Sequence, residues 1–285
     1  MKRVGLWAVM GIGLFLTVGL LTVEPGYTEE KEHEPTCTLK TLKGRYLFGG
    51  ITTLLDPDAP DPLVKPQLLA IAGYHTFNGD GTGTDIVTVT INGVLVRENF
   101  VTPITYTVNP DCSGTIAILA TGESLSIFIA PHGEELIAGG DSRPSFRAQN
   151  VLETEDDPPP CTLATLKGRY LFGGIATLLP PAVPQQSLLE VAGYHIFNGD
   201  GTGTDIVTAL INGESVEKNA GENPDRSEYD ITYTVNPDCS GTYTVPAAGA
   251  SFGIYVAPNG EALIVIGTNP GTILVQGPSR RVSRK

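Results

Sequence analysis

Two histidine–aspartate pairs are the residues in this chain whose types and spacing could support chemistry. His75 precedes Asp85, and His195 precedes Asp205 at the same spacing. A histidine held by a carboxylate can act as a general base, or it can fix a polar group of a ligand in a pocket. The same contact also occurs where two buried polar groups simply satisfy each other. We therefore treat these four residues as candidate ligand-binding residues, with a structural rim pair as the alternative.

Each pair flanks a glycine-rich turn that predicts a β-hairpin. The turn is Gly79-Asp80-Gly81, and it returns as Gly199-Asp200-Gly201 between similar strands of alternating polarity. A three-residue loop whose last glycine is left-handed is a common hairpin form. It places these pairs opposite each other on one face: Ile71 and Val89, Gly73 and Val87, His75 and Asp85. A two-residue loop would shift the register by one and set apolar residues against threonines, so we predict the three-residue loop.

Two other chemistries can be weighed from nearby motifs. Asn78, Asp80 and Thr82 alternate as in a calcium loop, but Val89 stands where an EF-hand needs its glutamate, and no helices flank the turn. A tight turn explains the glycines without an ion, and weak calcium binding there stays open. Ser113 and its counterpart in the second repeat follow a cysteine without the G-x-S-x-G elbow of a hydrolase. We assign no catalytic residue, no metal ligand and no cofactor.

The hairpin belongs to a repeat that spans most of the chain. Residues 37–151 and 161–285 carry the same order of motifs, and an acidic, proline-rich segment at 152–160 joins them as an extended linker. Each repeat contains about eight short strand patterns separated by tight turns, with no convincing amphipathic helix. We predict an all-β fold of two tandem antiparallel up-and-down β-barrels, because closure removes exposed edge strands. The basic segment from Arg280 to the C-terminus is interpreted as a solvated end.

The N-terminal region and the cysteines both indicate export. Residues 1–23 hold two basic residues and then an uncharged apolar run, which is typical of a signal peptide or an uncleaved N-terminal anchor. Residues 24–36 form an acidic, polar spacer. The chain has four cysteines, and the repeat favours one bridge per domain in an oxidising compartment, Cys37–Cys112 and Cys161–Cys239. We expect an extracytoplasmic protein that is secreted, periplasmic or held at the cell surface.

Several apolar side chains are expected on the outer face of the strands, where polar ones would be usual. Tyr74 and Phe128 have counterparts in Tyr194 and Tyr255. A contiguous patch of this kind can mark an interface, whereas scattered surface hydrophobes are ordinary. We name these four residues as a candidate interface for packing between domains or between copies.

Three motifs resemble those of a group of secreted bacterial proteins that have no assigned activity. They are Gly44-Arg-Tyr-Leu-Phe48, Phe77-Asn-Gly-Asp-Gly-Thr-Gly83 and Tyr106-Thr-Val-Asn-Pro-Asp-Cys-Ser-Gly-Thr115, against the patterns G-x-Y, F-D-G-x-G and Y-T-V-N-x-D-C-x-G-T. Asn78 and Asn198 replace the aspartate of the middle pattern. More distantly, the first strand is similar to that of the calycin superfamily, which includes the lipocalins, although Tyr46 and Tyr170 stand where a tryptophan is expected. This resemblance implies a small barrel that holds an apolar ligand.

Three functions are compatible with these observations. The leading hypothesis is an exported, non-catalytic tandem barrel protein that binds a small apolar ligand in each barrel. The first alternative is a structural or adhesive cell-surface protein that acts through its outer faces, with self-association or a cell-surface partner. The second is an enzyme on a calycin-like barrel that uses the histidine–aspartate pairs. A formal net charge of −13 argues against a nucleic-acid partner.

Overall fold

The computed structural model of the protein describes residues 36–54, 67–140, 143–150, 159–216 and 227–283. The predicted signal peptide or anchor at 1–23 lies outside the described residues, as do nearly all of the spacer and most of the linker. Residues 35–285 form one compact unit that contains both repeats.

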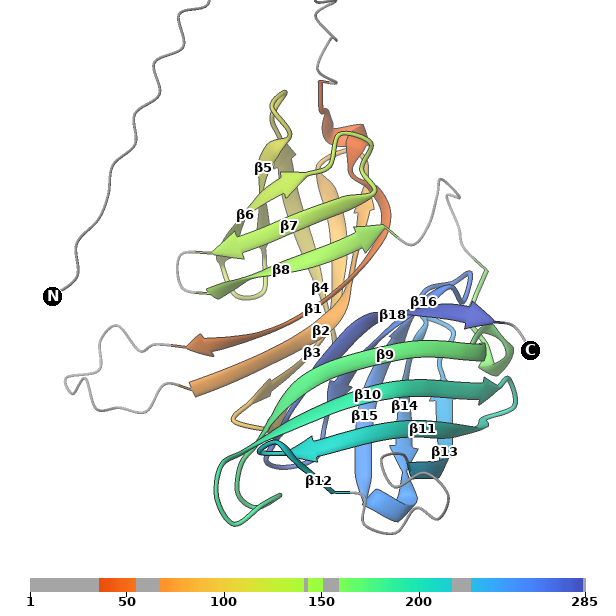
Figure 1. The fold of residues 1–285 in the computed structure, drawn as a ribbon. Coiled ribbons are helices and arrows are strands. Elements are labelled where there is room, and N and C mark those ends of the chain that lie inside the picture. Colours follow the sequence, from red (N-terminus) through yellow and green to blue (C-terminus); the bar gives the residue numbers. More distant parts are fainter. Residues whose placement is uncertain (1–35, 55–66, 141–142, 151–158, 217–226, 284–285) are drawn as a thin grey trace, which may run out of the picture. The chain divides into compact units, whose positions relative to one another are not determined.

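The first repeat is a closed antiparallel barrel in which each strand pairs with the next and the last pairs with the first (Figure 1). The predicted fold is confirmed. Its strands are β1 (Lys43–Leu54), β2 (Gln67–Asn78), β3 (Thr82–Ile91), β4 (Val94–Val108), β5 (Ser113–Ile118), β6 (Glu123–Ile129), β7 (Glu135–Gly140) and β8 (Arg143–Asn150).

The second repeat forms a barrel of the same order, with two short additions. The strand β12 pairs with β11, and β17 pairs with β9. β9 also pairs with β10 on one side and β18 on the other, which carries the sheet around the barrel. The strands are β9 (Lys167–Leu178), β10 (Ser187–Asn198), β11 (Thr202–Ile211), β12 (Glu214–Ser215), β13 (Ser227–Val235), β14 (Ser240–Val245), β15 (Ala250–Val256), β16 (Ala262–Gly267), β17 (Thr272–Ile273) and β18 (Val275–Ser283).

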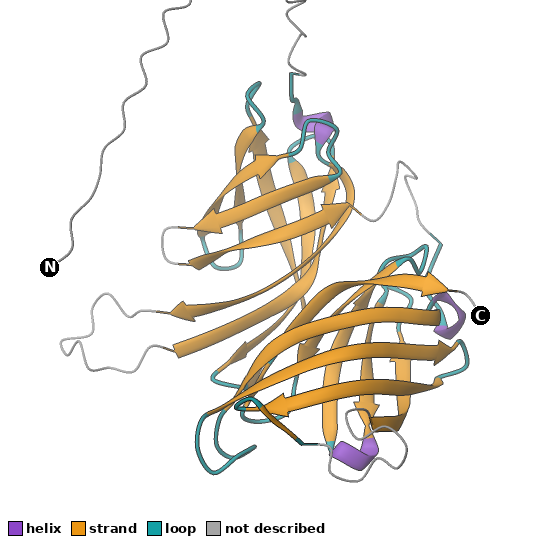
Figure 2. Ribbon diagram, viewed as in Figure 1, coloured by secondary structure: helices purple, strands orange, loops and turns teal. Residues whose placement is uncertain are grey.

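Helix is confined to single 3₁₀ turns in the described part of the chain (Figure 2). These are η1 (Leu39–Thr41), η2 (Leu163–Thr165) and η3 (Pro246–Ala248). Among the residues that the structure describes, no helix has the length and apolarity needed to cross a membrane.

The C-terminal segment corrects one prediction. We expected a solvated end from Arg280, but β18 runs to Ser283, and Arg280 pairs with both Leu171 and Ala262. The physical reason is closure of the barrel, because without β18 one edge of β9 would be left with unpaired backbone groups. The Arg281 side chain is compatible with this position because its guanidinium binds Glu261.

Both predicted disulfides are confirmed, and each braces the closed end of its barrel. Cys37 is bonded to Cys112, and Cys161 to Cys239, with Cα atoms 5.0 Å apart in each pair. At the same end of the first barrel, the Tyr46 hydroxyl donates to the carbonyl of Gly133 at 2.5 Å, and Tyr106 donates to that of Leu42 at 3.0 Å. These buried tyrosines therefore close one end, and the remaining interior lies towards the other.

The two barrels contact each other through an apolar cluster. Outward side chains of β1, β2 and β3 meet outward side chains of β15, β16 and β17. The buried members from the first barrel are Leu47, Ala70, Ala72, Tyr74 and Ile86, and those from the second are Tyr255, Ala257, Ala262, Ile264, Ile266 and Ile273.

Candidate functional site

The central hairpins have the register that the sequence predicts. β2 ends at Asn78 and β3 begins at Thr82, so the loop has three residues, and Gly81 is left-handed with φ 94°. His75 pairs with Asp85, and His195 pairs with Asp205. Both candidate pairs are therefore brought together inside their barrels.

Each histidine is held on two sides. Nδ1 of His195 and Oδ1 of Asp205 are hydrogen-bonded at 2.7 Å, and His75 makes the same bond to Asp85. The His75 ring stacks on Phe48 with centroids 4.2 Å apart, and the His195 ring stacks on Phe172 at 4.0 Å. The imidazole orientation is fixed by these contacts. All four polar residues are almost fully buried, at 4% exposure or less.

The second pair differs from the first by an added phenol. The Tyr243 hydroxyl donates to Oδ2 of Asp205 at 3.1 Å, whereas Ile116 occupies the corresponding place in β5. Burial, together with the neighbouring Asp205, raises the pKa of Tyr243 well above its ordinary value, so the phenol keeps its proton at neutral pH. Nε2 of His195 is buried and has no hydrogen-bond partner within the described part of the protein.

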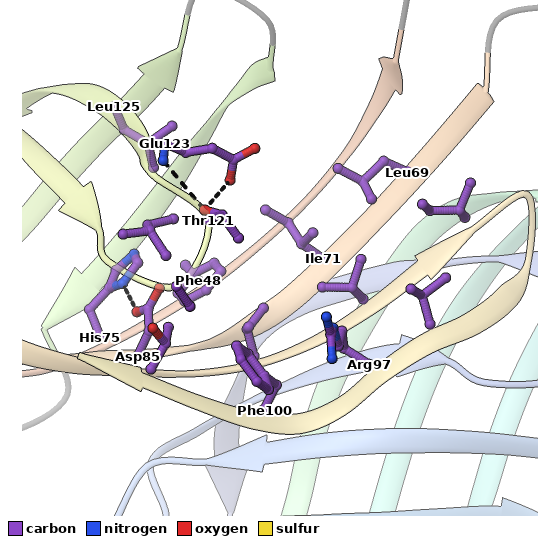
Figure 3. A pocket seen from close by; sticks show the side chains of 17 residues that line it. Phe48, Leu69, Ile71, His75, Asp85, Arg97, Phe100, Thr121, Glu123 and Leu125 are labelled. Atoms are coloured by element: carbon purple, nitrogen blue, oxygen red, sulfur yellow. Dashed lines mark hydrogen bonds and ion pairs between the residues drawn. The ribbon is translucent and has the colours of Figure 1, made fainter. Parts of the chain in front are cut away.

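The first barrel holds a cavity of about 250 Å³ that His75 and Asp85 help to line. Its wall is mostly aliphatic, with Leu69 and Ile71 on β2 (Figure 3). His75 and Asp85 lie together at one end, and Arg97 projects from β4 along the side, where its guanidinium lies 4.8 Å from the Phe100 ring centroid. Thr121 and Glu123, which are hydrogen-bonded to each other, line the wall from the β5–β6 turn.

The second barrel holds a larger cavity of about 490 Å³. Asp205 and Tyr243 supply its polar lining near the pair, and Phe172 and Phe252 contribute aromatic walls. The smaller Ala209 stands at the position that Val89 occupies in the first barrel, which leaves more room between the strands. Both cavities are therefore mainly apolar spaces with a few polar groups in their linings.

The other residues with chemical potential are engaged within their own turns. The hydroxyl of Ser113 donates to Asp111 at 2.6 Å, and that of Ser240 donates to Asp238 at 2.7 Å, so neither serine contacts a histidine. Asp80 accepts hydrogen bonds from the backbone and hydroxyl of Thr82 at the β2–β3 turn, and these bonds lower the pKa of its carboxyl. Neither serine therefore forms a triad with a histidine–aspartate pair.

The four candidate interface residues have different environments. Tyr74 and Tyr255 are buried where the barrels meet, with ring centroids 6.0 Å apart. Phe128 is 65% exposed, and Tyr194 is partly exposed. The candidate interface thus divides into two residues used within the chain and two that are not.

Sequence reasoning missed three lining residues. Tyr243 could have been found, since alternation along β14 directs it inward with Val245. Arg97 and Phe100 could not, because irregular pairing between β3 and β4, with Asn99 at φ 46°, interrupts the alternation. Arg97 changes the first cavity from a plain apolar space to one with a cation beside it.

No protein-family model and no curated protein matches this chain.

Proposed function

We propose that the protein is an exported, non-catalytic carrier in which each barrel binds one small, mainly apolar molecule. The observation that carries this proposal is an interior cavity in each barrel that reaches the buried polar pair: His75 and Asp85 both line the first cavity, and Asp205 lines the second. Ligand sites are typically apolar spaces of about 300–1,000 Å³ with a few placed polar groups. The second cavity falls within this range, and the first, slightly below it, suits a smaller molecule.

The polar end of each cavity gives the ligand an orientation. A hydroxyl or carbonyl on an otherwise apolar molecule would pair with the imidazole or the carboxylate, and the rest would lie against the aliphatic wall. The predicted signal peptide or anchor and the two disulfides suit an extracytoplasmic location, either secreted, periplasmic or at the cell surface. The likeness to secreted bacterial proteins and, more distantly, to calycin barrels agrees with this function.

The first test is native mass spectrometry of the protein purified from its own source. We expect a reproducible extra mass that disappears on extraction with organic solvent. A bare mass under gentle ionisation, together with failure of an apolar fluorescent probe to bind the purified chain, would refute the proposal.

Variants separate a ligand role from a structural one. Ala209→Phe fills the second cavity and should abolish probe binding there, whereas Thr234→Phe adds the same ring on the outside of β13 and should leave binding unchanged. In the first barrel, His75→Leu combined with Asp85→Leu replaces both buried partners by apolar groups, which is often nearly neutral for stability. If this double variant folds and binds the extracted ligand as well as the wild type does, the pair is structural only.

A further inference from the structure

Each barrel has two outer faces that are used differently. The hairpin face consists of the outward side chains of its first three strands, β1–β3 or β9–β11. The late-strand face consists of the outward side chains of β6–β7 or β15–β16. Within the chain, the hairpin face of the first barrel packs on the late-strand face of the second. The contact joins two different surfaces, so it is heterologous.

A polar clamp sits at the edge of this contact. The Tyr74 hydroxyl donates to the backbone carbonyl of Asp238 at 2.6 Å, and the guanidinium of Arg45 donates to the same oxygen at 3.2 Å. Arg45 also lies over the Tyr74 ring, 4.2 Å from its centroid. Burial raises the pKa of Tyr74 to about 12, so its hydroxyl remains a donor at neutral pH.

The unused hairpin face of the second barrel carries the same residues. Leu171 repeats Leu47; Leu171 is 52% exposed, whereas Leu47 is fully buried in the contact. Arg169 lies over the Tyr194 ring, 5.0 Å from its centroid, as Arg45 lies over Tyr74. The second barrel therefore carries its own copy of the hairpin side of the contact.

The unused late-strand face of the first barrel carries the other half. Phe128 repeats Tyr255, and Ile137 repeats Ile264; they are 65% and 44% exposed. Asp111 occupies the same turn as Asp238, after the same strand motif. Exposed aromatic and aliphatic side chains that match a contact already made within the chain identify an interface rather than scattered surface hydrophobes.

We propose that the hairpin face of the second barrel docks on the late-strand face of the first barrel in a second copy of this chain. The contact between copies repeats the contact within the chain, with Arg169 and Tyr194 clamping the turn at Asp111. A heterologous contact leaves one unused face at each end, so copies add head to tail into rings or open chains.

Two charged residues weaken this contact relative to the one within the chain. Glu190 stands where the first barrel has Ala70, and Glu135 stands where the second has Ala262. Removing ionised carboxylates from water costs free energy. No linker holds two copies together either, so association depends on concentration. Replacing both glutamates by alanine should tighten association by at least about tenfold, or about 1.4 kcal/mol.

The test is sedimentation velocity of residues 35–285, with both disulfides formed, from low to high micromolar concentration. The wild type should form a concentration-dependent ladder of oligomers. Tyr194→Asp and Phe128→Asp should each be monomeric, and Thr234→Asp, an exposed position outside both faces, should behave as the wild type. Circular dichroism and thermal melting establish that each variant is folded.

A mixture of the two variants tests whether the contact joins two different faces. An equimolar mixture of the Tyr194→Asp and Phe128→Asp variants keeps one intact face of each kind, so it should form a one-to-one dimer and nothing larger. If Tyr194→Asp unfolds, Gly173→Asp replaces it, because a Cβ at Gly173 meets nothing closer than 3.7 Å. A wild type that is monomeric at every concentration overturns the proposal. So does either variant that still dimerises alone, since that dimer would be made by two identical faces.

Discussion

A pair of matched glycines measures the contact between the barrels directly. Gly49 on β1 and Gly173 on β9 occupy the same place in the two repeats, and each faces outward. A Cβ at Gly49 would lie 2.6 Å from Cγ1 of Val275 and 3.2 Å from Cγ2 of Ile264, whereas a Cβ at Gly173 would meet only a carbonyl at 3.7 Å. The same substitution therefore tests a packed surface in one repeat and a free one in the other.

We expect Gly49→Ala to destabilise the protein relative to Gly173→Ala by about 1–3 kcal/mol. The nearer distance is about 1 Å shorter than the optimal carbon–carbon separation, and overpacking of this kind costs about that amount. Replacing glycine by alanine also restricts the unfolded chain, which stabilises by about 0.4–1 kcal/mol. Both variants share this gain, so the difference between them reports the contact alone.

The assay is urea unfolding followed by far-ultraviolet circular dichroism, with both variants and the wild type compared at the first transition. Gly173→Ala should be as stable as the wild type or slightly more stable. If the free energies of unfolding of the two variants agree within about 0.5 kcal/mol, which is the usual range for surface substitutions, the close approach of the barrels at Gly49 is wrong.

Three further predictions follow from contacts in the described residues. Replacing Cys37 and Cys112 by alanine removes a bridge between residues 75 positions apart. The lost restriction of the unfolded chain should lower the free energy of unfolding by about 4 kcal/mol in urea denaturation, and a loss of less than about 1 kcal/mol would contradict this. Tyr255→Phe removes a buried hydroxyl that is hydrogen-bonded to two side chains of the first barrel. In thermal unfolding this variant should lose about 1–3 kcal/mol of stability, whereas Phe128→Tyr on the exposed face should lose nothing measurable. Burial raises the pKa of Tyr74 to about 12. Above about pH 10 the unfolded state therefore loses the phenol proton first, and the free energy of unfolding falls until about pH 12. Tyr74→Phe should make that fall shallower in a pH series of urea midpoints, and an unchanged slope would refute the assignment.

Local rules were enough to predict the hairpin and the bridges. The glycines at Gly79 and Gly81 restrict the loop, and alternation then fixes which side chains face each other, so His75 meets Asp85. The cysteines follow from the repeat, since each copy contains two at nearly the same separation. These features depend on residues close in sequence or on internal symmetry, which one sequence contains.

Tyr74 and Tyr255 were candidates for packing between domains, but motifs alone could not show which faces of the barrels meet, because the repeats are nearly identical where their environments differ most. Tyr74 is buried and Tyr194 is partly exposed, although the surrounding residues are the same. The signal lies in the differences between the repeats. Ala70 is replaced by Glu190, and Ala262 by Glu135, so each buried position is apolar where its partly exposed counterpart is charged. A comparison of the repeats position by position would have indicated which two faces are covered.

The same comparison shows that the interiors of the two barrels differ as well. The Tyr243 hydroxyl occupies one oxygen of Asp205, whereas Ile116 at the same place donates nothing to Asp85. The carboxylate of the second barrel therefore has less capacity to accept a bond from a ligand, although its cavity is nearly twice as large. A molecule that binds the first barrel through a donated hydroxyl proton would lose that bond in the second. The two barrels should consequently differ in the ligand they prefer, and the contact between copies, which uses only outer faces, would be unaffected by which cavity is filled.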